Sequence, residues 1–414
     1  MSETPLQPAP PIPPGRLWLQ RMLTALFALL LGLPLFQQVT RAIPESSLAG
    51  VEFRLPKPVF SWPAWFDGRY AANVEKWLQG VVAFRGTLVH LACQANYSLF
   101  NRVGLSGGTE ITCGRKHWLY ETAYIKSAVR QPDFSAEKAA RLAKRAAKLS
   151  QKLAARGIAF AVVIAPSKAE VLPEHLPASV KLPPRSSDTA YARITRELEK
   201  QNVPVLDVRS LFIGLKKTEP HLFPKTGTHW SAYSAWLAWQ QVAGVLEARQ
   251  PGTRFVSPPP ALVMSPPLGS DDDLLRLSNL WRFEPGGPKP LPYPVVPPPP
   301  PEWRDRYQAV VVGDSFCLTM VDAMARSGLF RQIDVLYYFQ RRFTYPVPSF
   351  EAAPDRLLAD TGIDMGSLDV AHLDWKPLLD NRQLVLLVIN ELHLKNMGWG
   401  SIGSMLAALD KTAP

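Results

Sequence analysis

Cysteine is scarce in this chain, which has only three cysteines among its 414 residues. Cys93, Cys113 and Cys317 form no CxxC pair and no metal-ligand spacing. Histidines such as His117 and His175 also lack a carboxylate or thiolate partner at the spacing of metal ligands. The sequence therefore predicts no metal site and no cofactor. It leaves open whether two of the cysteines form a disulfide or all three are free thiols.

Charged residues are also few, at 20% of the chain, whereas 47% of the residues are hydrophobic. Such a composition, with 12 tryptophans and 18 phenylalanines, excludes a largely disordered protein. The formal net charge of +11 suits an anionic partner such as an acidic polysaccharide or lipid headgroups. Nucleic acid is not predicted as a partner, because the positive charge is scattered and no nucleic-acid-binding motif is present.

One long apolar run lies near the start of the chain. A proline-rich tail, residues 1–16, is followed by Arg21 and by the uncharged stretch 22–36. Residues 17–38 supply the roughly 20 residues that cross a hydrocarbon layer of about 30 Å, which predicts a transmembrane signal anchor with the tail in the cytoplasm. A cleaved signal peptide is the alternative, although residues 39–42 offer a poor cleavage site.

The rest of the chain divides into a helical lead-in, residues 43–110, and a region of alternating helices and strands, residues 111–400. Predicted helices in the second region are 135–157, 187–200, 231–247 and 316–326, and predicted strands are 158–165, 203–208, 309–312, 333–338 and 384–390. This alternation predicts an α/β fold with a doubly wound parallel sheet, in which ligands bind at the carboxyl ends of the strands. The proline-rich stretch 251–301 is predicted to be an insertion in this domain.

The strongest catalytic signal is a serine where a buried strand gives way to a helix. Residues 310–316 read Val-Val-Val-Gly-Asp-Ser-Phe, so Gly313, Asp314 and Ser315 form the turn. A serine there presents its hydroxyl above the sheet edge, and its backbone N–H, at the start of a helix, can stabilise an oxyanion. The alternative is that Ser315 only caps the helix.

His229 is the histidine best placed to act as a base for Ser315. It lies just before a predicted apolar helix, where a loop residue at the head of the sheet can reach the serine. On spacing alone, His229 is equally well explained as an ordinary residue at a helix start.

Several motifs occur in an order that resembles the alginate O-acetyltransferase family, the AlgJ and AlgX type of SGNH-hydrolase-like proteins. They are residues 68–77, 84–85, 118–120, 165–168, 172–177, 205–207, 228–230, 274–280 and 313–316. The resemblance implies that residues 111–400 form an SGNH-like catalytic domain, circularly permuted so that the base His229 precedes the nucleophile Ser315. It also implies a location at the inner membrane with the soluble domain in the periplasm.

The resemblance further implies acetyl transfer through an acetyl-serine to hydroxyls of a secreted exopolysaccharide, alginate-like or cellulose-like. Expected partners are the polymer, the membrane and other polysaccharide-acetylation or export proteins, including a membrane acyl-transferring protein. An acetylesterase would use the same residues.

One departure from the family pattern concerns the acid that orients the histidine. The family has Asp-x-His-Trp, but this chain has Gly227 two residues before His229. Three explanations stay open: Asp207 or Glu219 replaces the acid, the site is a weaker serine–histidine dyad, or the protein is a catalytically silent scaffold that binds polymer.

Further residues are predicted around the site. Asp314 is expected to bond backbone groups at its turn rather than to serve as the acid. Asn279 and Asn390 are weak candidates for the oxyanion site. A sugar cleft is predicted to include Trp230, Arg341, Asn390 and Glu391, with solvated surface charge as the alternative for Arg341 and Glu391.

Overall fold

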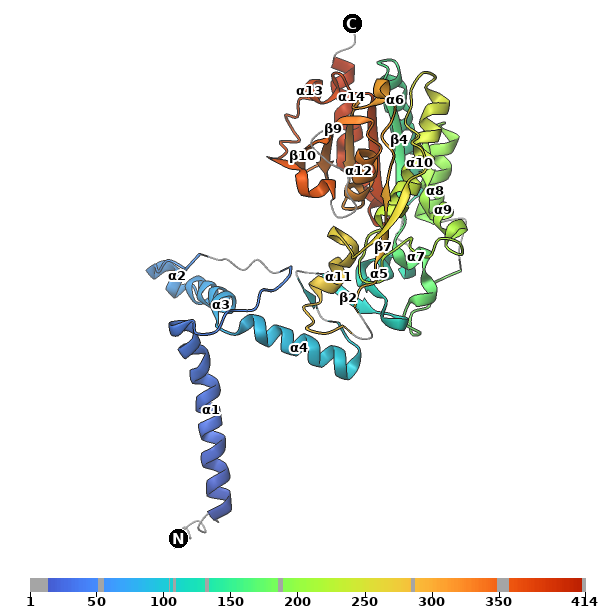
Figure 1. The fold of residues 1–414 in the computed structure, drawn as a ribbon. Helices are drawn as coiled ribbons and strands as arrows, with labels where there is room; N and C mark the ends of the chain where they lie inside the picture. The colour runs from blue at the N-terminus through green and yellow to red at the C-terminus, as the bar shows by residue number, and fades with distance from the viewer. Residues whose placement is uncertain are drawn as a thin grey trace, which may run out of the picture. The chain divides into compact units, whose positions relative to one another are not determined.

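A computed structural model describes residues 14–50, 56–103, 105–106, 109–130, 134–184, 189–283, 287–347 and 357–411. The chain forms two compact units (Figure 1). The N-terminal unit contains residues 1–100 and 279–281, and the C-terminal unit contains residues 101–278 and 282–414. The predicted cytoplasmic tail falls largely outside the described residues.

The N-terminal unit is helical. Its helices are α1 Pro14–Thr40, α2 Trp62–Phe66, α3 Arg69–Val81 and α4 Arg85–Phe100. Within residues 15–40 of α1, the most apolar 18-residue window has a mean hydropathy of 1.8, and 6% of that window is buried. This exposed apolar helix contains the predicted span 17–38 and fits a single-pass membrane anchor.

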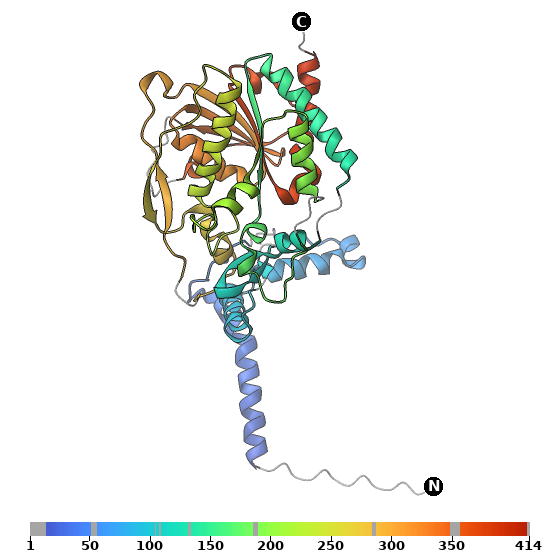
Figure 2. The same cartoon turned by 90° about the vertical axis from the view of Figure 1, so that its right-hand side faces the viewer.

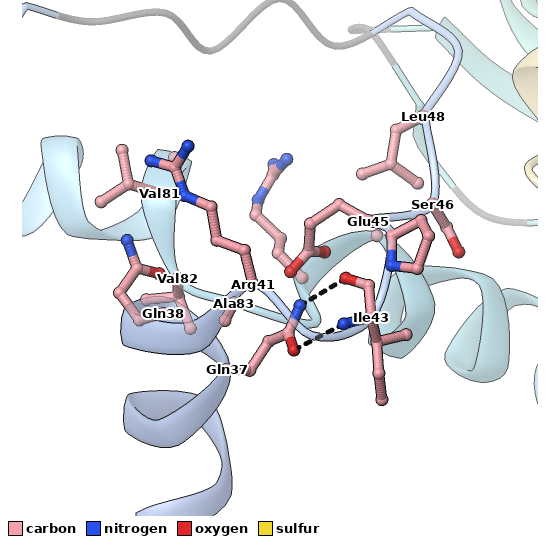
Figure 3. Close-up of a pocket in the computed structure, with 14 residues that line it drawn as sticks. Gln37, Gln38, Arg41, Ile43, Glu45, Ser46, Leu48, Val81, Val82 and Ala83 are labelled. Carbon is pink, nitrogen blue, oxygen red and sulfur yellow. Dashed lines mark hydrogen bonds between the residues drawn. The ribbon is translucent and has the colours of Figure 1, made fainter.

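A cavity of about 1220 Å³ lies at the C-terminal end of α1, lined by residues of the segments 37–48 and 80–86 (Figure 3). The buried side chain of Gln37 fixes the chain where it turns away from the helix. Its Nε2 donates to the carbonyl oxygen of Ile43 at 2.5 Å, and its Oε1 accepts from the backbone N–H of Ile43 at 3.1 Å. Gln37, near the C-terminal end of α1, thus hydrogen-bonds the backbone N–H and C=O of a residue that lies beyond the last turn of the helix.

The C-terminal unit is built on a seven-stranded sheet with strand order β11-β10-β9-β8-β12-β4-β5. The strands are β4 Ala159–Ala165, β5 Val205–Asp207, β8 Tyr307–Gly313, β9 Phe330–Tyr337, β10 Arg341–Pro346, β11 Ile363–Ser367 and β12 Leu384–Asn390. The five strands from β9 to β5 are parallel, as predicted, whereas β10 and β11 pair antiparallel. The sheet is therefore mixed, because the three residues between β9 and β10 allow a hairpin but no crossover.

Helices cover both faces of this sheet (Figure 2). On one face, a hydrophobic core joins the sheet to α9 Val208–Leu215, α10 Ala232–Arg249 and α12 Phe316–Arg326. On the other, a second core joins it to α6 Ala136–Ala154, α8 Ala190–Lys200 and α14 Ser401–Lys411. The central strands β4, β8 and β12 are buried along their whole length, which explains their continuous apolar sequences and confirms the doubly wound α/β fold.

Smaller elements complete the unit. They are β1 Leu105–Ser106, β2 Thr109–Cys113, β3 Leu119–Glu121, α5 Thr122–Arg130, α7 Lys168–Val171, α13 Lys376–Leu379 and the 3-10 segment η7 Glu391–Gly400. The insertion 251–301 holds an antiparallel pair, β6 Ala261–Ser265 with β7 Leu291–Val295, and the short helix α11 Asp273–Leu277. The proline-rich insertion is therefore partly ordered, and its helix α11 becomes important at the site.

Candidate active site

Ser315 lies between the end of β8 and the start of α12, as the sequence predicts. Its side chain makes no capping hydrogen bond, so the alternative of a simple helix cap does not describe it. The turn needs glycine at Gly313, because a Cβ there would lie 2.4 Å from the Cβ of Cys317 and 2.6 Å from the carbonyl oxygen of Val388. Ser315 thus lies uncapped at the carboxyl end of β8, the edge of such sheets where ligands bind.

Asp314 holds the turn together from inside the protein. Its fully buried carboxylate accepts the backbone N–H of Phe316 at 3.1 Å and that of Asn390 at 2.6 Å. These bonds agree with the predicted role of Asp314 in satisfying backbone groups. The same carboxylate also lies 2.9 Å from Nδ1 of His393, a histidine that the sequence reasoning missed. A second acid–histidine pair therefore lies directly beside Ser315.

His229 precedes α10 and is oriented by a carboxylate from the insertion. Its Nδ1 lies 2.9 Å from Oδ2 of Asp273, whose Oδ1 accepts the backbone N–H of Thr228 at 2.8 Å. Because the carboxylate can only accept, Nδ1 carries the proton, and in the neutral imidazole Nε2 is then the unprotonated atom that a base requires. Nε2 is buried and has no hydrogen-bond partner among the described residues, and the imidazole packs 4.8 Å from the ring of Phe316.

The acid on His229 is Asp273, and the two predicted substitutes lie elsewhere. Asp207 caps α9 by accepting the backbone N–H of Ser210 at 2.8 Å and also accepts the hydroxyl of Tyr191 at 2.5 Å. Glu219 hydrogen-bonds Tyr233 instead. The predictions of Asp207 and Glu219 were wrong. The acid comes from the insertion, and the spacing of residues along the chain does not reveal which side chain of the insertion reaches His229. The one available signal was the run Asp271-Asp272-Asp273 within the insertion.

Gly227 has a structural reason that the sequence did not reveal. A Cβ on Gly227 would lie 2.5 Å from the carbonyl oxygens of Ser270 and Asp271. The backbone of the insertion therefore packs directly against residue 227. This packing places Asp273 next to His229. A glycine is needed where the family pattern has its aspartate, because the close approach leaves no room for a side chain.

Lys168, in α7, fixes the loop that carries the histidine. Its buried Nζ donates to the carbonyl oxygen of Pro224 at 2.8 Å and to that of Gly227. The ammonium also lies over the rings of Trp118, at 5.6 Å, and Tyr120, at 5.3 Å. Burial lowers the pKa of Lys168 to about 7. The lysine of the Ala-Pro-Ser-Lys motif thus stabilises the loop that carries His229.

Two further side chains enclose the site. Burial raises the pKa of Glu121, which lies at the end of β3. The imidazoles of His229 and His393 lower the same pKa, so this one carboxyl group lies close to both histidines. Burial also raises the pKa of Tyr338, after β9, and hydrogen bonding with the side chain and backbone of Ser315 opposes that rise. Neither residue carried a sequence signal, because only the folded sheet edge brings them to Ser315.

Two of the residues predicted to line a sugar cleft are buried and have structural roles instead. Trp230 is fully buried in the core and cannot contact a sugar. Asn390 is fully buried, donates to the carbonyl oxygen of Ala165 at 3.3 Å and accepts the backbone N–H of Leu392 at 2.9 Å. These two predictions were wrong because residues next to a catalytic turn are often buried to hold it in place.

The remaining predicted residues are engaged in other interactions. Glu391 accepts the backbone N–H of Ser167 at 2.8 Å, and burial raises its pKa to about 7, so it is not surface charge. Arg341, in β10, forms an exposed ion pair with Asp364 in the neighbouring edge strand β11, which agrees with the alternative of solvated surface charge. Asn279 belongs to the N-terminal unit. Its Oδ1 accepts the backbone N–H of Ala49 at 2.9 Å.

In the part of the chain that the structure describes, no group of three or more His, Cys, Asp or Glu side chains could hold a metal ion. Cys93, Cys113 and Cys317 are all free thiols, which resolves the alternative that the sequence left open.

Comparison with known proteins identifies the domain. Residues 111–316 match the family model described as "SGNH hydrolase-like domain, acetyltransferase AlgX". A probable alginate O-acetylase AlgJ from Pseudomonas fluorescens is 27% identical over 189 residues, which cover 45% of this chain and only 44% of that protein.

Matches among solved structures include an AlgJ domain and an AlgX protein. The O-acetyltransferase domain of Pseudomonas putida AlgJ is 19% identical with a TM-score of 0.42, and the match covers 73% of this chain and 99% of that domain. Pseudomonas aeruginosa AlgX is 15% identical with a TM-score of 0.40, and the match covers 76% of this chain and 71% of that one. By the matched family model, the chain belongs to the AlgJ/AlgX-type family of SGNH hydrolase-like proteins.

Proposed function

We propose that this protein is a polysaccharide O-acetyltransferase that works through an acetyl-Ser315 intermediate. The observation that carries the proposal is an uncapped serine at the β8–α12 turn together with His229, whose ring packs against the next residue, Phe316, and whose Nδ1 is held by Asp273. A serine nucleophile, a histidine base and an orienting carboxylate are the parts that acyl transfer needs. Membership of an acetyltransferase family supports the same reaction class.

In the first half-reaction, Nε2 of His229 takes the proton of Ser315 as its Oγ attacks the carbonyl carbon of an acetyl-ester donor. The leaving oxygen of the donor then departs with that proton, which leaves an acetyl ester on Ser315. In the second half-reaction, a sugar hydroxyl gives its proton to Nε2 and attacks the acetyl group, and Ser315 recovers the proton as it leaves. Asp273 stabilises the imidazolium in both halves because it accepts from Nδ1.

Both tetrahedral intermediates carry a negative oxygen that needs donors. The backbone N–H of Ser315 lies at the N-terminus of the 11-residue helix α12, where the helix dipole also favours negative charge. This arrangement supports Ser315 N–H as one donor of the oxyanion site.

His393 supplies a second imidazole beside the serine turn. Its Nδ1 is held by Asp314, so Nε2 is the unprotonated atom of the neutral imidazole, and its side chain is 26% exposed compared with 12% for His229. The more exposed His393 suits a hydrogen bond that positions an incoming sugar hydroxyl, while the more buried His229 takes the proton in both half-reactions.

The exported location and the partners belong to the same proposal. The apolar helix α1 fits an inner-membrane anchor with the C-terminal unit in the periplasm. There the domain would meet an exopolysaccharide, alginate-like or cellulose-like, and a membrane acyl-transferring protein as the source of acetyl groups.

The direct test uses the full chain in detergent with a chromogenic acetyl ester, with and without a polysaccharide acceptor. We expect acceptor-dependent acetyl transfer that falls by at least a thousandfold in Ser315→Ala and in His229→Ala. Equal rates in all three proteins would exclude the serine mechanism and favour a silent, polymer-binding role. Ester cleavage that no polysaccharide accelerates, with no acetylated polymer formed, would indicate an acetylesterase.

A further inference from the structure

A group of aromatic side chains lies on the surface of the N-terminal unit, in and around α2. Its members, which we call the aromatic cluster, are Phe60, Trp62, Trp65, Phe66 and Tyr70. Their rings pack on one another, with centroids 5.1 Å apart for Phe60 and Trp62 and 5.2 Å apart for Phe60 and Tyr70. Four of the five residues are exposed, from 46% for Phe60 to 81% for Phe66.

The aromatic cluster is large enough to be an interaction surface. An aromatic side chain has about 150–250 Å² of surface to bury, so four that are about half exposed or more present on the order of 400 Å². Among the described residues, none of α2 or α3 is buried, so the rings are not the edge of a core. A contiguous apolar patch of this size is typical of a surface that meets a protein or a membrane.

The aromatic cluster belongs to the unit that carries the apolar helix α1. Residues 17–36 of α1 cover about 30 Å at 1.5 Å per residue, so Gln37 and Gln38 follow at the level of the lipid headgroups if α1 spans the bilayer. Both glutamines line the same cavity as Gly80 and Val81 at the end of α3 (Figure 3). The C-terminal end of α3 therefore lies at the headgroup level.

The length of α3 limits how far the aromatic cluster can lie from the membrane surface. This helix has 13 residues, which span about 20 Å, and only Asp67 and Gly68 separate it from α2. Figure 1 shows α2 and α3 at the C-terminal end of α1. The rings thus lie within reach of the bilayer that α1 enters.

The composition of the aromatic cluster suits a bilayer surface. Tryptophan and tyrosine are enriched at membrane–water interfaces, because each joins a large apolar ring to a polar N–H or O–H. The α2 sequence is Trp-Pro-Ala-Trp-Phe, and no leucine, isoleucine or methionine occurs in residues 59–70. Asp67 and Arg69 form an exposed ion pair at 2.7 Å beside the rings, which suits the polar headgroup layer.

We propose that the aromatic cluster is a second membrane contact, in which the rings around α2 enter the layer between the lipid headgroups and the upper acyl chains. Together with α1 it would hold the N-terminal unit against the bilayer at two points. The inference rests on the proposed membrane anchor and is independent of the proposed reaction.

The test measures how closely lipid approaches a fluorophore at position 66. The full chain, with Cys93→Ser, Cys113→Ser and Phe66→Cys, is labelled with the dye NBD and placed in vesicles of equal amounts of phosphatidylethanolamine and phosphatidylglycerol. Cys317 is buried and should not react. We expect lipids that are spin-labelled near the glycerol end of the acyl chain to quench this label at least threefold more than a label at Met264→Cys. Met264 is the matched control, because it is an apolar residue of the C-terminal unit that is 56% exposed.

A label at Leu30→Cys, in the middle of α1, reports on the anchor separately. Lipids that are spin-labelled near the end of the acyl chain should quench it strongly. In the Phe66→Cys protein, Trp62→Ser combined with Trp65→Ser should reduce quenching at least twofold, and Leu99→Ser, which removes an exposed leucine of α4, should leave it unchanged. Because no residue of α2 is buried, these substitutions do not disturb a core.

Quenching at Leu30→Cys but no more quenching at Phe66→Cys than at Met264→Cys would overturn the second contact and leave the anchor standing. An absence of quenching at both Leu30→Cys and Phe66→Cys would overturn the anchor and the second contact together. A Phe66→Cys label that is shielded from aqueous iodide but not quenched by lipid would show a second copy of the chain on the cluster, which would also overturn the proposal.

Discussion

Replacing Asp273 by asparagine should remove most of the activity while leaving the fold intact. The side chain keeps its shape, and its remaining oxygen can still accept the backbone N–H groups of Thr228 and Leu274, which Asp273 accepts at 2.8 and 2.6 Å. The new amide group, however, donates to Nδ1 of His229 and so forces the proton onto Nε2. A histidine in that tautomer cannot take the proton of Ser315.

The size of the effect follows from this tautomer change. Loss of the orienting carboxylate in serine enzymes lowers turnover by about four orders of magnitude, which corresponds to about 5 kcal/mol in the transition state. The His229–Asp273 pair is shielded enough for a loss of this size, with side chains 12% and 20% exposed. Asp273→Asn should therefore lose between a thousandfold and ten-thousandfold in kcat with a nearly unchanged Tm.

Two comparison variants separate orientation from stability. Asp273→Ala also removes the acceptor for the two backbone N–H groups and should cost about 1–2 kcal/mol of stability in addition to the activity. Asp272→Asn changes the neighbouring charge, which pairs with Arg276, and should leave kcat within about twofold. Initial rates of acetyl-ester cleavage and thermal unfolding supply both readouts. An Asp273→Asn protein that keeps more than a tenth of wild-type kcat would refute the assignment of Asp273 as the orienting acid.

Four further predictions follow from the packing around the site. Gly227→Asp should lower Tm and abolish activity, since a Cβ would lie 2.5 Å from two carbonyl oxygens; increased activity would contradict this. His393→Gln should slow transfer to a sugar acceptor at least a hundredfold while the pre-steady-state burst of acylation remains; equal slowing of both steps would remove its separate role. Lys168→Met should leave buried carbonyl oxygens of the 224–227 loop unpaired and cost about 1–3 kcal/mol in chemical unfolding. Burial raises the pKa of Asp271 to about 7, so the folded protein binds this proton where the unfolded chain has lost it, and stability should fall as pH rises from about 4 to about 7. Asp271→Asn should flatten that slope in unfolding curves at pH 4.5 to 8, and an unchanged slope would contradict the assignment.

Gly227 illustrates how a missing residue can be misread from sequence. Its presence left three explanations open, two of which involved a weakened or silent enzyme. The insertion delivers Asp273 to His229 from 44 residues further along the chain, and its backbone approaches so closely that glycine is required. The departure from the family pattern is therefore the consequence of supplying the acid from another segment.

Short-range patterns were enough for the sequence to determine the apolar helix α1, the segments that become the parallel strands, and the Gly-Asp-Ser turn. Hydrophobic runs and the Gly-Asp-Ser turn depend on neighbouring residues, and the helices α6, α10 and α12 begin within one residue of their predicted starts. The tertiary structure alone decided the acid on His229, the pairing of Asp314 with His393, and the burial of Trp230 and Asn390. These contacts join segments that meet only when the carboxyl ends of separate strands and the insertion are packed against one sheet edge, and no local pattern encodes which side chains face each other there.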